Sequence, residues 1–217
     1  LTGAYNALTM NPLRAKKVLA SNSNVKAFNG TNVLEEGKTV GVNCVANTNP
    51  ITFTGDSKII IGSESCSFAI YGKIVSTSSA GSTIIGTAES GKGTFGLSCL
   101  NNSLWFECID SAGVKTTPTG ISVALDDTNV LLSCVLNRAT GKTLLYRNGV
   151  LLGTTTLNSG FGNITSTVFY ILRQIANVSG KIISFNWFNY ALSADEIRKL
   201  YNNGKPTLRP LDSYMKW

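Results

Sequence analysis

Short apolar and β-branched runs recur along most of this sequence, about every 8–12 residues, and turn residues separate them. The turn signals include Thr54-Gly55-Asp56, Ser90-Gly91 and Asn158-Ser159-Gly160. The runs predict strands at residues 40–45, 51–53, 58–61, 67–75, 83–87, 93–100, 103–109, 121–125, 130–137, 143–147, 150–156, 165–173 and 181–188. This spacing is typical of an all-β sandwich or barrel and argues against a helical bundle.

The clearest local signal is a hairpin. Asn148-Gly149 stands between two apolar runs, and this pair favours a two-residue type I′ turn because both turn residues need positive φ angles. In the strand upstream, alternate residues would line one face, while Leu131 and Val135 keep the other face partly apolar. The residues of the first face are Val130, Leu132, Cys134 and Leu136. We therefore expect a β-meander whose first strand is covered on both sides.

One helix is well specified, at residues 194–201. Ser193 is the expected N-cap, and Glu196, three positions later, completes a capping box. Gly204 is expected to take the left-handed conformation that ends the helix. The helix carries a single apolar stripe, which must pack on the sandwich. The stripe consists of Ile197, Leu200 and Tyr201.

A family resemblance follows from the end of this region. A strand that begins Gly180-Lys181-Ile182 leads through Ala191-Leu192-Ser193 to a helix that ends Leu200-Tyr201-Asn202-Asn203-Gly204. This run resembles the closing signature of LamG-like domains, which belong to the concanavalin A-like lectin/glucanase superfamily. Tyr146-Arg147-Asn148-Gly149 resembles the family's Tyr-x-Asn-Gly hairpin, and residues 51–56 are similar to its first strand.

The resemblance implies an all-β fold, a concanavalin A-like jelly-roll sandwich of two antiparallel sheets with one short C-terminal helix. We expect an N-terminal arm at residues 1–30, the LamG-like domain at residues 31–205 and a C-terminal tail at residues 206–217.

The stretch before residue 130 is polar where the family often carries a Trp-His pair. Asp126, Asp127 and Asn129 could supply some of the oxygen ligands of a structural calcium ion, and loop calcium is common in this superfamily. A polar turn between two strands is the alternative, and both interpretations stay open at this point. No other cofactor is expected.

The net charge of +7 comes from 19 basic and 12 acidic residues and is spread along the chain. No stretch forms a basic stripe for nucleic acid, and no apolar run approaches the length of a membrane span. We therefore expect neither nucleic-acid binding nor membrane insertion. We expect protein partners in an assembly, including a homo-oligomer. The candidate assembly contacts are Arg14, Lys16, Lys17 and Trp217.

Most of the five cysteines lie in apolar, strand-like runs, where a free cysteine behaves as a small buried hydrophobe. The chain has no His and no Cys-x-x-Cys pair, so a zinc site is not expected. Reduced, buried thiols indicate synthesis in a reducing cytoplasm. Cys99 and Cys108 flank an expected hairpin, and a disulfide between them is the alternative.

Glycoside hydrolysis requires two carboxyl groups, about 5–5.5 Å or 6.5–9.5 Å apart. Glucanases of this superfamily carry theirs on alternate residues of one strand, and no such run occurs here. Glu107 and Asp110 come closest, but a spacing of three directs them to opposite strand faces. The absence of His excludes Ser-His and Cys-His nucleophiles. The sequence predicts a protein that is not an enzyme.

Glycan binding requires an aromatic platform beside polar groups. Trp105, Tyr71 and Tyr170 are the candidate glycan-binding residues. Trp105 lies in an apolar hairpin strand, so a core position is the alternative for this side chain. Trp187 matches a core position of the closing strand and is expected inside the sandwich.

These observations predict a non-catalytic structural or adhesive module of a larger assembly. LamG-like domains occur as accessory modules of phage and cell-surface proteins, so the resemblance implies a component of a phage virion, such as a capsid decoration, head or tail fibre, which could contact surface glycans. The expected location is a virion or extracellular surface. A soluble carbohydrate-binding, lectin-like module is the alternative, and a glycoside hydrolase or lyase is the third class, against which the missing carboxylate run argues.

Overall fold

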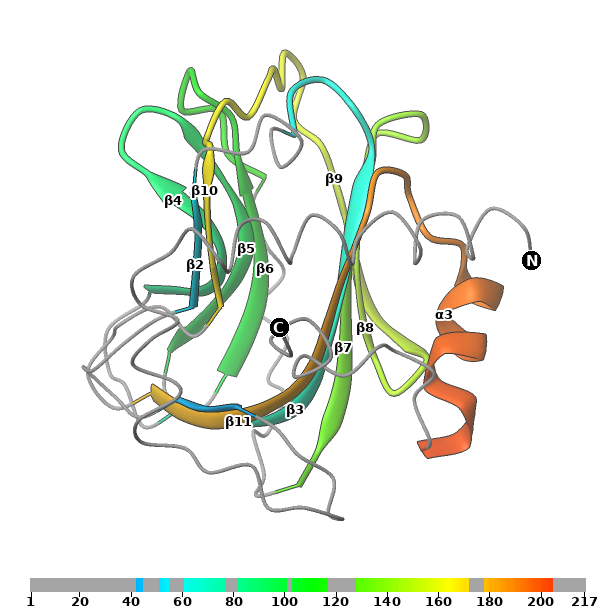
Figure 1. The fold of residues 1–217 in the computed structure, drawn as a ribbon. Helices are drawn as coiled ribbons and strands as arrows, with labels where there is room; N and C mark the ends of the chain where they lie inside the picture. The colour runs from blue at the N-terminus through cyan, green and yellow to red at the C-terminus, as the bar shows by residue number, and fades with distance from the viewer. Residues whose placement is uncertain are drawn as a thin grey trace.

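Two antiparallel β-sheets face each other, and one short helix lies outside them (Figure 1). The computed structural model describes residues 42–44, 51–54, 61–76, 82–100, 103–116, 128–171 and 178–204. In this part of the chain, one sheet has six strands in the order β1-β11-β3-β7-β8-β9, and the other has five in the order β2-β10-β4-β5-β6. The predicted sandwich with one short helix is confirmed.

The strands agree closely with the sequence-based expectation wherever the chain is described. The six-stranded sheet consists of β1 (Val42–Cys44), β3 (Cys66–Ser76), β7 (Val130–Asn137), β8 (Lys142–Arg147), β9 (Val150–Thr156) and β11 (Val178–Phe188). The five-stranded sheet consists of β2 (Ile51–Thr54), β4 (Ser82–Glu89), β5 (Gly93–Leu100), β6 (Ser103–Ile109) and β10 (Val168–Ile171). The expected strand at residues 121–125 and most of the one at 58–61 lie outside the described residues.

The strand expected at residues 165–173 begins later in the structure, because β10 (Val168–Ile171) starts at Val168, and residues 172–173 lie outside the described residues. Just before it, the Ser166 hydroxyl and the Thr167 backbone N–H both donate to Glu89 Oε2, each at 2.7 Å. These side-chain contacts replace sheet pairing at the start of the predicted strand.

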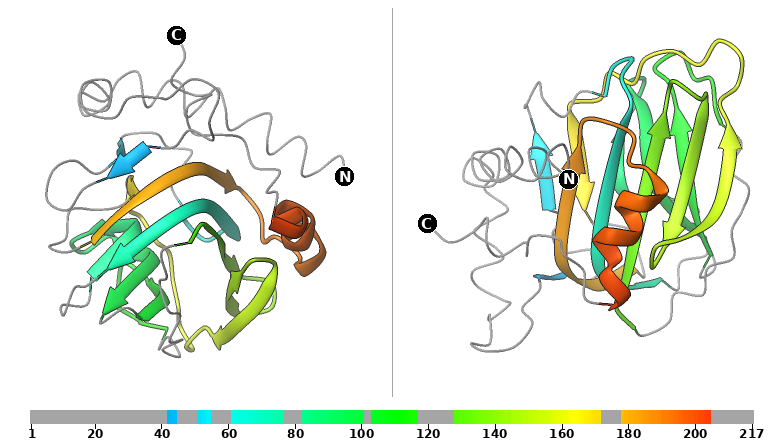
Figure 2. Two further views of the ribbon diagram at one scale, coloured as in Figure 1. Left: turned by 90° about the horizontal axis from the view of Figure 1, so that it is seen from below. Right: turned by 90° about the vertical axis from the view of Figure 1, so that its right-hand side faces the viewer.

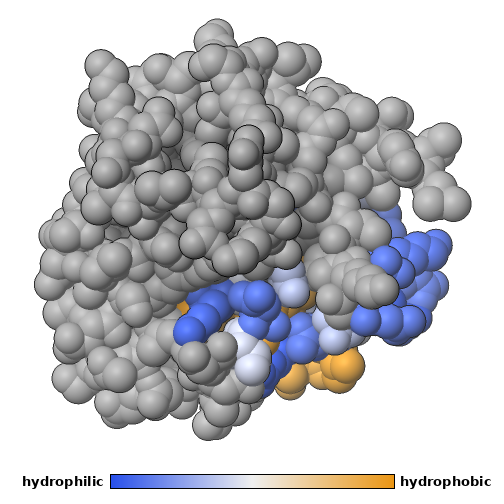
Figure 3. All heavy atoms as spheres, turned by 60° about the horizontal axis from the view of Figure 1, so that its bottom comes forward, coloured by the Kyte–Doolittle hydropathy of each residue, from blue (hydrophilic) through white to orange (hydrophobic). Residues whose placement is uncertain are grey.

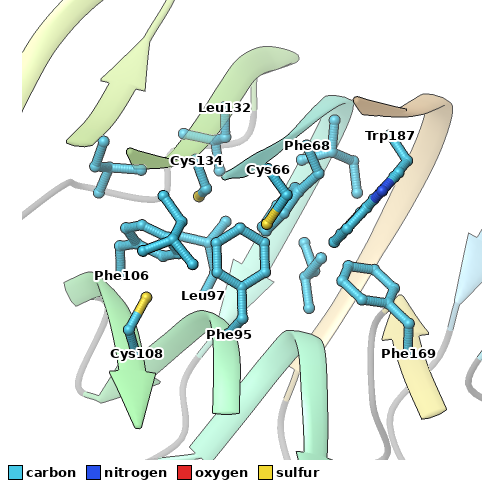
Figure 4. Packing of buried hydrophobic residues seen from close by; sticks show 14 of the residues in the cluster. Cys66, Phe68, Phe95, Leu97, Phe106, Cys108, Leu132, Cys134, Phe169 and Trp187 are labelled. Atoms are coloured by element: carbon cyan, nitrogen blue, oxygen red, sulfur yellow. The ribbon is translucent and has the colours of Figure 1, made fainter. Parts of the chain in front are cut away.

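The core between the sheets is built around aromatic rings (Figure 4). The Phe68 ring meets Phe95 and Phe169 edge to face, with ring centroids 5.6 and 5.7 Å apart. Trp187 meets Phe95 and Phe169 in the same way, at 5.8 and 5.5 Å. The predicted core position of Trp187 is confirmed, since only 8% of this residue is exposed. Edge-to-face contacts add to the stabilisation from burial of these large rings.

Helix α3 (Ala194–Tyr201) lies over the outer face of the six-stranded sheet (Figure 2). A second apolar cluster lies beneath it. Leu131 and Val135 of β7 pack there against Ile197 and Leu200 of the helix. The alternate residues of β7 pack in the core between the sheets, as predicted: Val130, Leu132, Cys134 and Leu136. β7 is therefore covered on both faces, and its nearly continuous apolar sequence follows from this position.

The predicted N-terminal cap of α3 is confirmed. The Ser193 hydroxyl accepts from the backbone N–H of Glu196 at 3.3 Å, and the Ser193 backbone N–H donates to Glu196 Oε2 at 2.8 Å. The predicted C-terminal cap is wrong, because Asn202 (φ 44°) rather than Gly204 takes the left-handed conformation that ends the helix. Asn adopts this conformation more readily than most residues do. No helix in the described part of the chain is long and apolar enough to span a membrane.

The predicted β8–β9 hairpin is also confirmed. Asn148 and Gly149 form its turn with φ angles of 52° and 80°. The Asn148 backbone N–H donates to Leu131 O at 2.8 Å, and the Leu131 backbone N–H donates to Asn148 Oδ1 at 2.9 Å. The turn is thus joined to β7. A Cβ atom on Gly149 would lie 3.5 Å from Arg198 Cα, so the hairpin also contacts α3.

Gly149→Val is expected to lower the free energy of unfolding by about 2 kcal/mol, because a β-branched residue resists a positive φ and its methyl groups would press on α3. Urea unfolding measures the change. Gly141→Val is the matched control, since Gly141 also has a positive φ (62°) but a Cβ atom there would have no neighbour within 4 Å. Equal losses in both variants would contradict a contact between the hairpin and α3.

Three of the cysteines, Cys66, Cys108 and Cys134, are buried free thiols, as predicted. Burial raises the pKa of each thiol. The alternative of a Cys99–Cys108 disulfide is wrong, because Cys108 is free. In the register of β5 and β6, Cys99 lies opposite Leu104 and Cys108 opposite Phe95. The two cysteines are therefore offset by about 13 Å along the strands, well beyond the reach of a disulfide.

Candidate functional site

A row of four residues crosses the outer face of the five-stranded sheet. Tyr170 of β10 lies opposite Gly86 of β4. Gly86 lies opposite Gly96 of β5, which in turn lies opposite Glu107 of β6. The residue before Tyr170, Phe169, belongs to the core, and successive side chains of a strand alternate between the two faces. The same alternation holds in β4, β5 and β6, so the whole row faces away from the core.

The middle of this row has no side chains. Gly86 and Gly96, which we call the glycine strip, separate the strands of Tyr170 and Glu107, which are three strand spacings or about 14 Å apart. Gly86 has a φ of 137°, and a Cβ atom there would lie only 2.2 Å from Phe95 O. Close approach of β5 therefore requires glycine at this position.

Trp105 and Ser98 extend the face beside the strip. Trp105 is two residues from Glu107 on β6, so the two side chains share a face, and it pairs across to Ser98 on β5. Trp105 is half-buried and lies outside the core cluster, so the alternative of a core position is wrong. The Ser98 hydroxyl donates to Glu107 Oε2 at 3.1 Å. This hydrogen bond orients the carboxylate on the outer face.

The three aromatic candidates do not form one platform. Trp105 and Tyr170 share the outer face of the five-stranded sheet, and both are half-buried. Tyr71 lies on β3 of the other sheet, where it packs against the cluster beneath α3. Two of the three predicted glycan-binding residues therefore lie on one surface with the glycine strip, and the third lies on the opposite side of the sandwich.

The metal and assembly candidates fall mainly outside the described residues. Asn129 is exposed just before β7. Asp126 and Asp127 lie outside the described residues, as do Arg14, Lys16, Lys17 and Trp217. Within the described ranges, no group of three or more Cys, Asp or Glu side chains is arranged to hold a metal ion. The calcium site and the assembly contacts remain predictions.

Two carboxylates away from this face, Asp110 and Glu89, accept hydrogen bonds from backbone N–H groups, and Glu89 also accepts one from a side-chain hydroxyl. Asp110 Oδ1 accepts from Ala112 N and Val114 N at 2.9 and 2.8 Å, and Oδ2 accepts from Gly162 N at 2.6 Å. Burial tends to raise the pKa of Asp110, but these backbone donors outweigh it and lower the pKa. The pKa of Glu89 is also lowered, first by its hydrogen bond from the Ser166 hydroxyl. A lowered pKa suits a permanent acceptor rather than a general acid near neutral pH.

Asp110 and Arg138 anchor the loop at residues 157–167, and neither role was predicted from the sequence. Arg138 Nη2 donates to Gly62 O at 3.1 Å, and its guanidinium lies 4.7 Å from the centre of the Phe161 ring. The run Asp110-Ser111-Ala112-Gly113 is typical of a turn in which the Asp side chain caps the following backbone N–H groups, so a signal for Asp110 was present. Arg138 had no comparable local signal.

Several solved structures share this fold. The chain matches the binding domain of Paraclostridial Mosquitocidal Protein 1 with a TM-score of 0.63 and 13% identity, over 79% of this chain and 45% of that one. It matches the binding domain of botulinum neurotoxin DC in complex with SialylT with a TM-score of 0.62 and 19% identity, over 80% and 45%. It matches the same binding domain in complex with rat synaptotagmin II with a TM-score of 0.58 and 20% identity, over 76% of this chain and 43% of that one. The chain thus spans less than half of each of these binding domains.

The sequence comparison identifies the family. No curated protein matches this chain. A family model described as the concanavalin A-like lectin/glucanases superfamily matches residues 45–198, which include β2 to β11 and the first turn of α3. With the two antiparallel sheets and the capped helix, this match means that the chain belongs to the concanavalin A-like lectin/glucanase superfamily.

Proposed function

We propose that this chain is a non-catalytic recognition module that binds neutral carbohydrate on the outer face of its five-stranded sheet. The observation that carries the proposal is the row formed by Tyr170, the glycine strip and Glu107, with Trp105 beside it. The glycine strip carries no side chains between the two aromatic residues, but Gly86 and Gly96 are themselves buried, so a sugar would contact this face through the half-buried Trp105, Tyr170 and Glu107.

The chemistry of the flanking groups matches the two kinds of surface that a sugar presents. The C–H face of a sugar stacks on an aromatic ring, which Trp105 and Tyr170 supply at either side of the strip. Sugar hydroxyls donate to a carboxylate, and Glu107 supplies one on the same face. The Glu107 charge repels an acidic sugar at close range, so neutral sugars are the favoured class.

The structural neighbours are consistent with a recognition role but do not assign a site to this chain. The binding domain of botulinum neurotoxin DC is described in complex with SialylT in one structure and with rat synaptotagmin II in a second. Because the chain spans less than half of each, their ligands need not be bound by the part that this chain resembles.

We also propose that the module is displayed in a larger homo-oligomeric assembly, such as a phage virion or a cell-surface structure. The basic residues of the expected arm, Arg14, Lys16 and Lys17, suit contacts with neighbouring protein. Size-exclusion chromatography with light scattering tests this part, and a strictly monomeric full chain would contradict it.

A glycan array tests the binding site. The full chain is expected to bind a class of neutral glycans, and Trp105→Ala and Tyr170→Ala are each expected to weaken binding at least about tenfold through loss of ring stacking. Tyr71→Ala is the matched control on the opposite sheet and should leave binding unchanged, with thermal unfolding used to verify that each variant is folded. Absence of binding to every glycan, or equal loss in the control, would overturn the proposal.

Glu107→Gln tests the proposed preference for neutral sugars. We expect about three- to tenfold weaker binding of the neutral glycan, because a neutral amide is a weaker acceptor than a carboxylate. Binding of sialylated glycans relative to neutral ones should increase, since the repulsive charge is removed. Titration calorimetry measures both, and an unchanged ratio would show that Glu107 does not select the sugar.

A further inference from the structure

β9 is an edge strand of the six-stranded sheet, far from the glycine strip. It pairs with β8 on one side, and it is the last strand in the order of the described sheet. The outward-facing backbone N–H and C=O groups of such a strand are available to a further strand. Proteins usually protect an edge with proline or charged residues. The sequence of β9, Val-Leu-Leu-Gly-Thr-Thr-Thr, contains neither.

This edge also carries exposed apolar side chains. Val150 and Leu151 are 65% and 47% exposed, and they are the exposed large hydrophobic residues of the described part of the chain. Figure 3 shows hydrophobic side chains beside strongly hydrophilic ones on the underside of the molecule, and Figure 1 places the β8–β9 turn at this end. Further along β9, Thr154 and Thr156 are exposed as well. Four of the seven residues of β9 are therefore exposed, whereas Leu152, Gly153 and Thr155 are half-buried.

The two strands of the β8–β9 hairpin carry positive charge only. Residues 128–194 contain no Asp or Glu, whereas β8, the neighbour of β9, contributes Lys142 and Arg147 at its two ends. Helix α3, which contacts the hairpin turn, contains two acidic and two basic residues and therefore adds no net charge. Its Arg198 forms an ion pair with Asp195. A second copy of this chain would bring the same positive charges together along paired β9 strands. An acidic segment would meet complementary charge.

We propose that β9 is a docking edge for an extended, acidic segment of a partner protein, which adds to the six-stranded sheet as a further strand. Backbone hydrogen bonds along β9 provide affinity that does not depend on sequence. Val150 and Leu151 contact apolar side chains of the segment, and the exposed Lys142 at the open end of the hairpin selects acidic residues. This surface is separate from the carbohydrate face, so both can be occupied together.

Fluorescence polarisation with synthetic peptides tests this proposal. The probes are a seven-residue peptide of alternating Val and Asp, the same peptide with Lys in place of Asp, and the acidic peptide with a central proline. We expect the acidic peptide to bind and the basic one not to bind. The proline peptide should bind at least about tenfold more weakly, because it loses a backbone donor and extended pairing. The proposal would be overturned if the acidic peptide bound no better with its regular sequence than with the central proline, or if no peptide bound.

Variants locate the contact on the protein. Leu151→Ser and Lys142→Ala should each weaken binding of the acidic peptide several-fold. Lys92→Ala, which removes an exposed lysine from the turn of the other sheet, is the charge-matched control and should have no effect. If the full chain instead forms a dimer that Leu151→Ser dissociates, the edge belongs to a second copy and the proposal is wrong. Because the readout contains no carbohydrate, its outcome is independent of the glycan-binding result.

Discussion

Gly86→Ala is expected to lower the free energy of unfolding by at least about 4 kcal/mol, enough to unfold a marginally stable domain. The added Cβ would lie 2.2 Å from Phe95 O and 2.4 Å from Gly96 Cα. Both atoms belong to the backbone of the neighbouring strand, so relief requires β4 and β5 to move apart in the middle of the sheet. The φ angle of 137° adds backbone strain for any residue with a side chain.

Denaturant unfolding measures this effect, and Gly91→Ala provides the control. Gly91 also has a positive φ (68°), but no atom lies within 4 Å of the position that its Cβ would take. This control should lose only about 1 kcal/mol, from backbone strain alone. A Gly86→Ala protein as stable as the Gly91→Ala protein would show that the two strands do not approach as closely as described.

Asp110→Asn is expected to lower the free energy of unfolding by about 3 kcal/mol at neutral pH. The substitution keeps the shape of the side chain, but its new amide group would face the backbone N–H of Gly162 with no acceptor between them. It also removes the charge that strengthens the hydrogen bonds from Ala112 and Val114. The loop at residues 157–167 should loosen first, which hydrogen exchange of Gly162 and its neighbours would detect.

The same carboxylate predicts a dependence of stability on pH. The pKa of Asp110 is lower in the folded protein than in the unfolded chain, so its stabilisation is complete above the unfolded pKa and is lost as pH falls through the folded pKa. The stability difference between the wild type and Asp110→Asn should therefore shrink from neutral pH toward about pH 3. Asp195→Asn, at an exposed residue of α3, should change stability by less than about 0.5 kcal/mol. A constant difference across this pH range would contradict the role assigned to Asp110.

The sequence predicted only part of the candidate site. The residue types of Trp105 and Tyr170 suggested sugar stacking, but so did Tyr71, which the structure places on the other sheet. The glycine strip was missed, although glycine inside two predicted strands often marks close approach of backbones. Glu107 was considered only as a catalytic acid. Its position beside the strip depends on the registers that join β10, β4, β5 and β6, and no local pattern specifies those registers.

The sequence by itself determined the elements whose causes are local. These are the strands, the Asn148-Gly149 turn, the capping box at Ser193 and the two-sided burial of β7, because each depends on alternation, turn chemistry or capping within a few residues. Only the tertiary structure decided which strands became neighbours. β11 lies between β1 and β3, and β10 lies between β2 and β4, although at least 78 residues separate each of these late strands from its early partners. Pairing over such distances is selected by the packing of the whole core, and this packing brought Trp105, the glycine strip and Tyr170 onto one face while it left β9 at an edge.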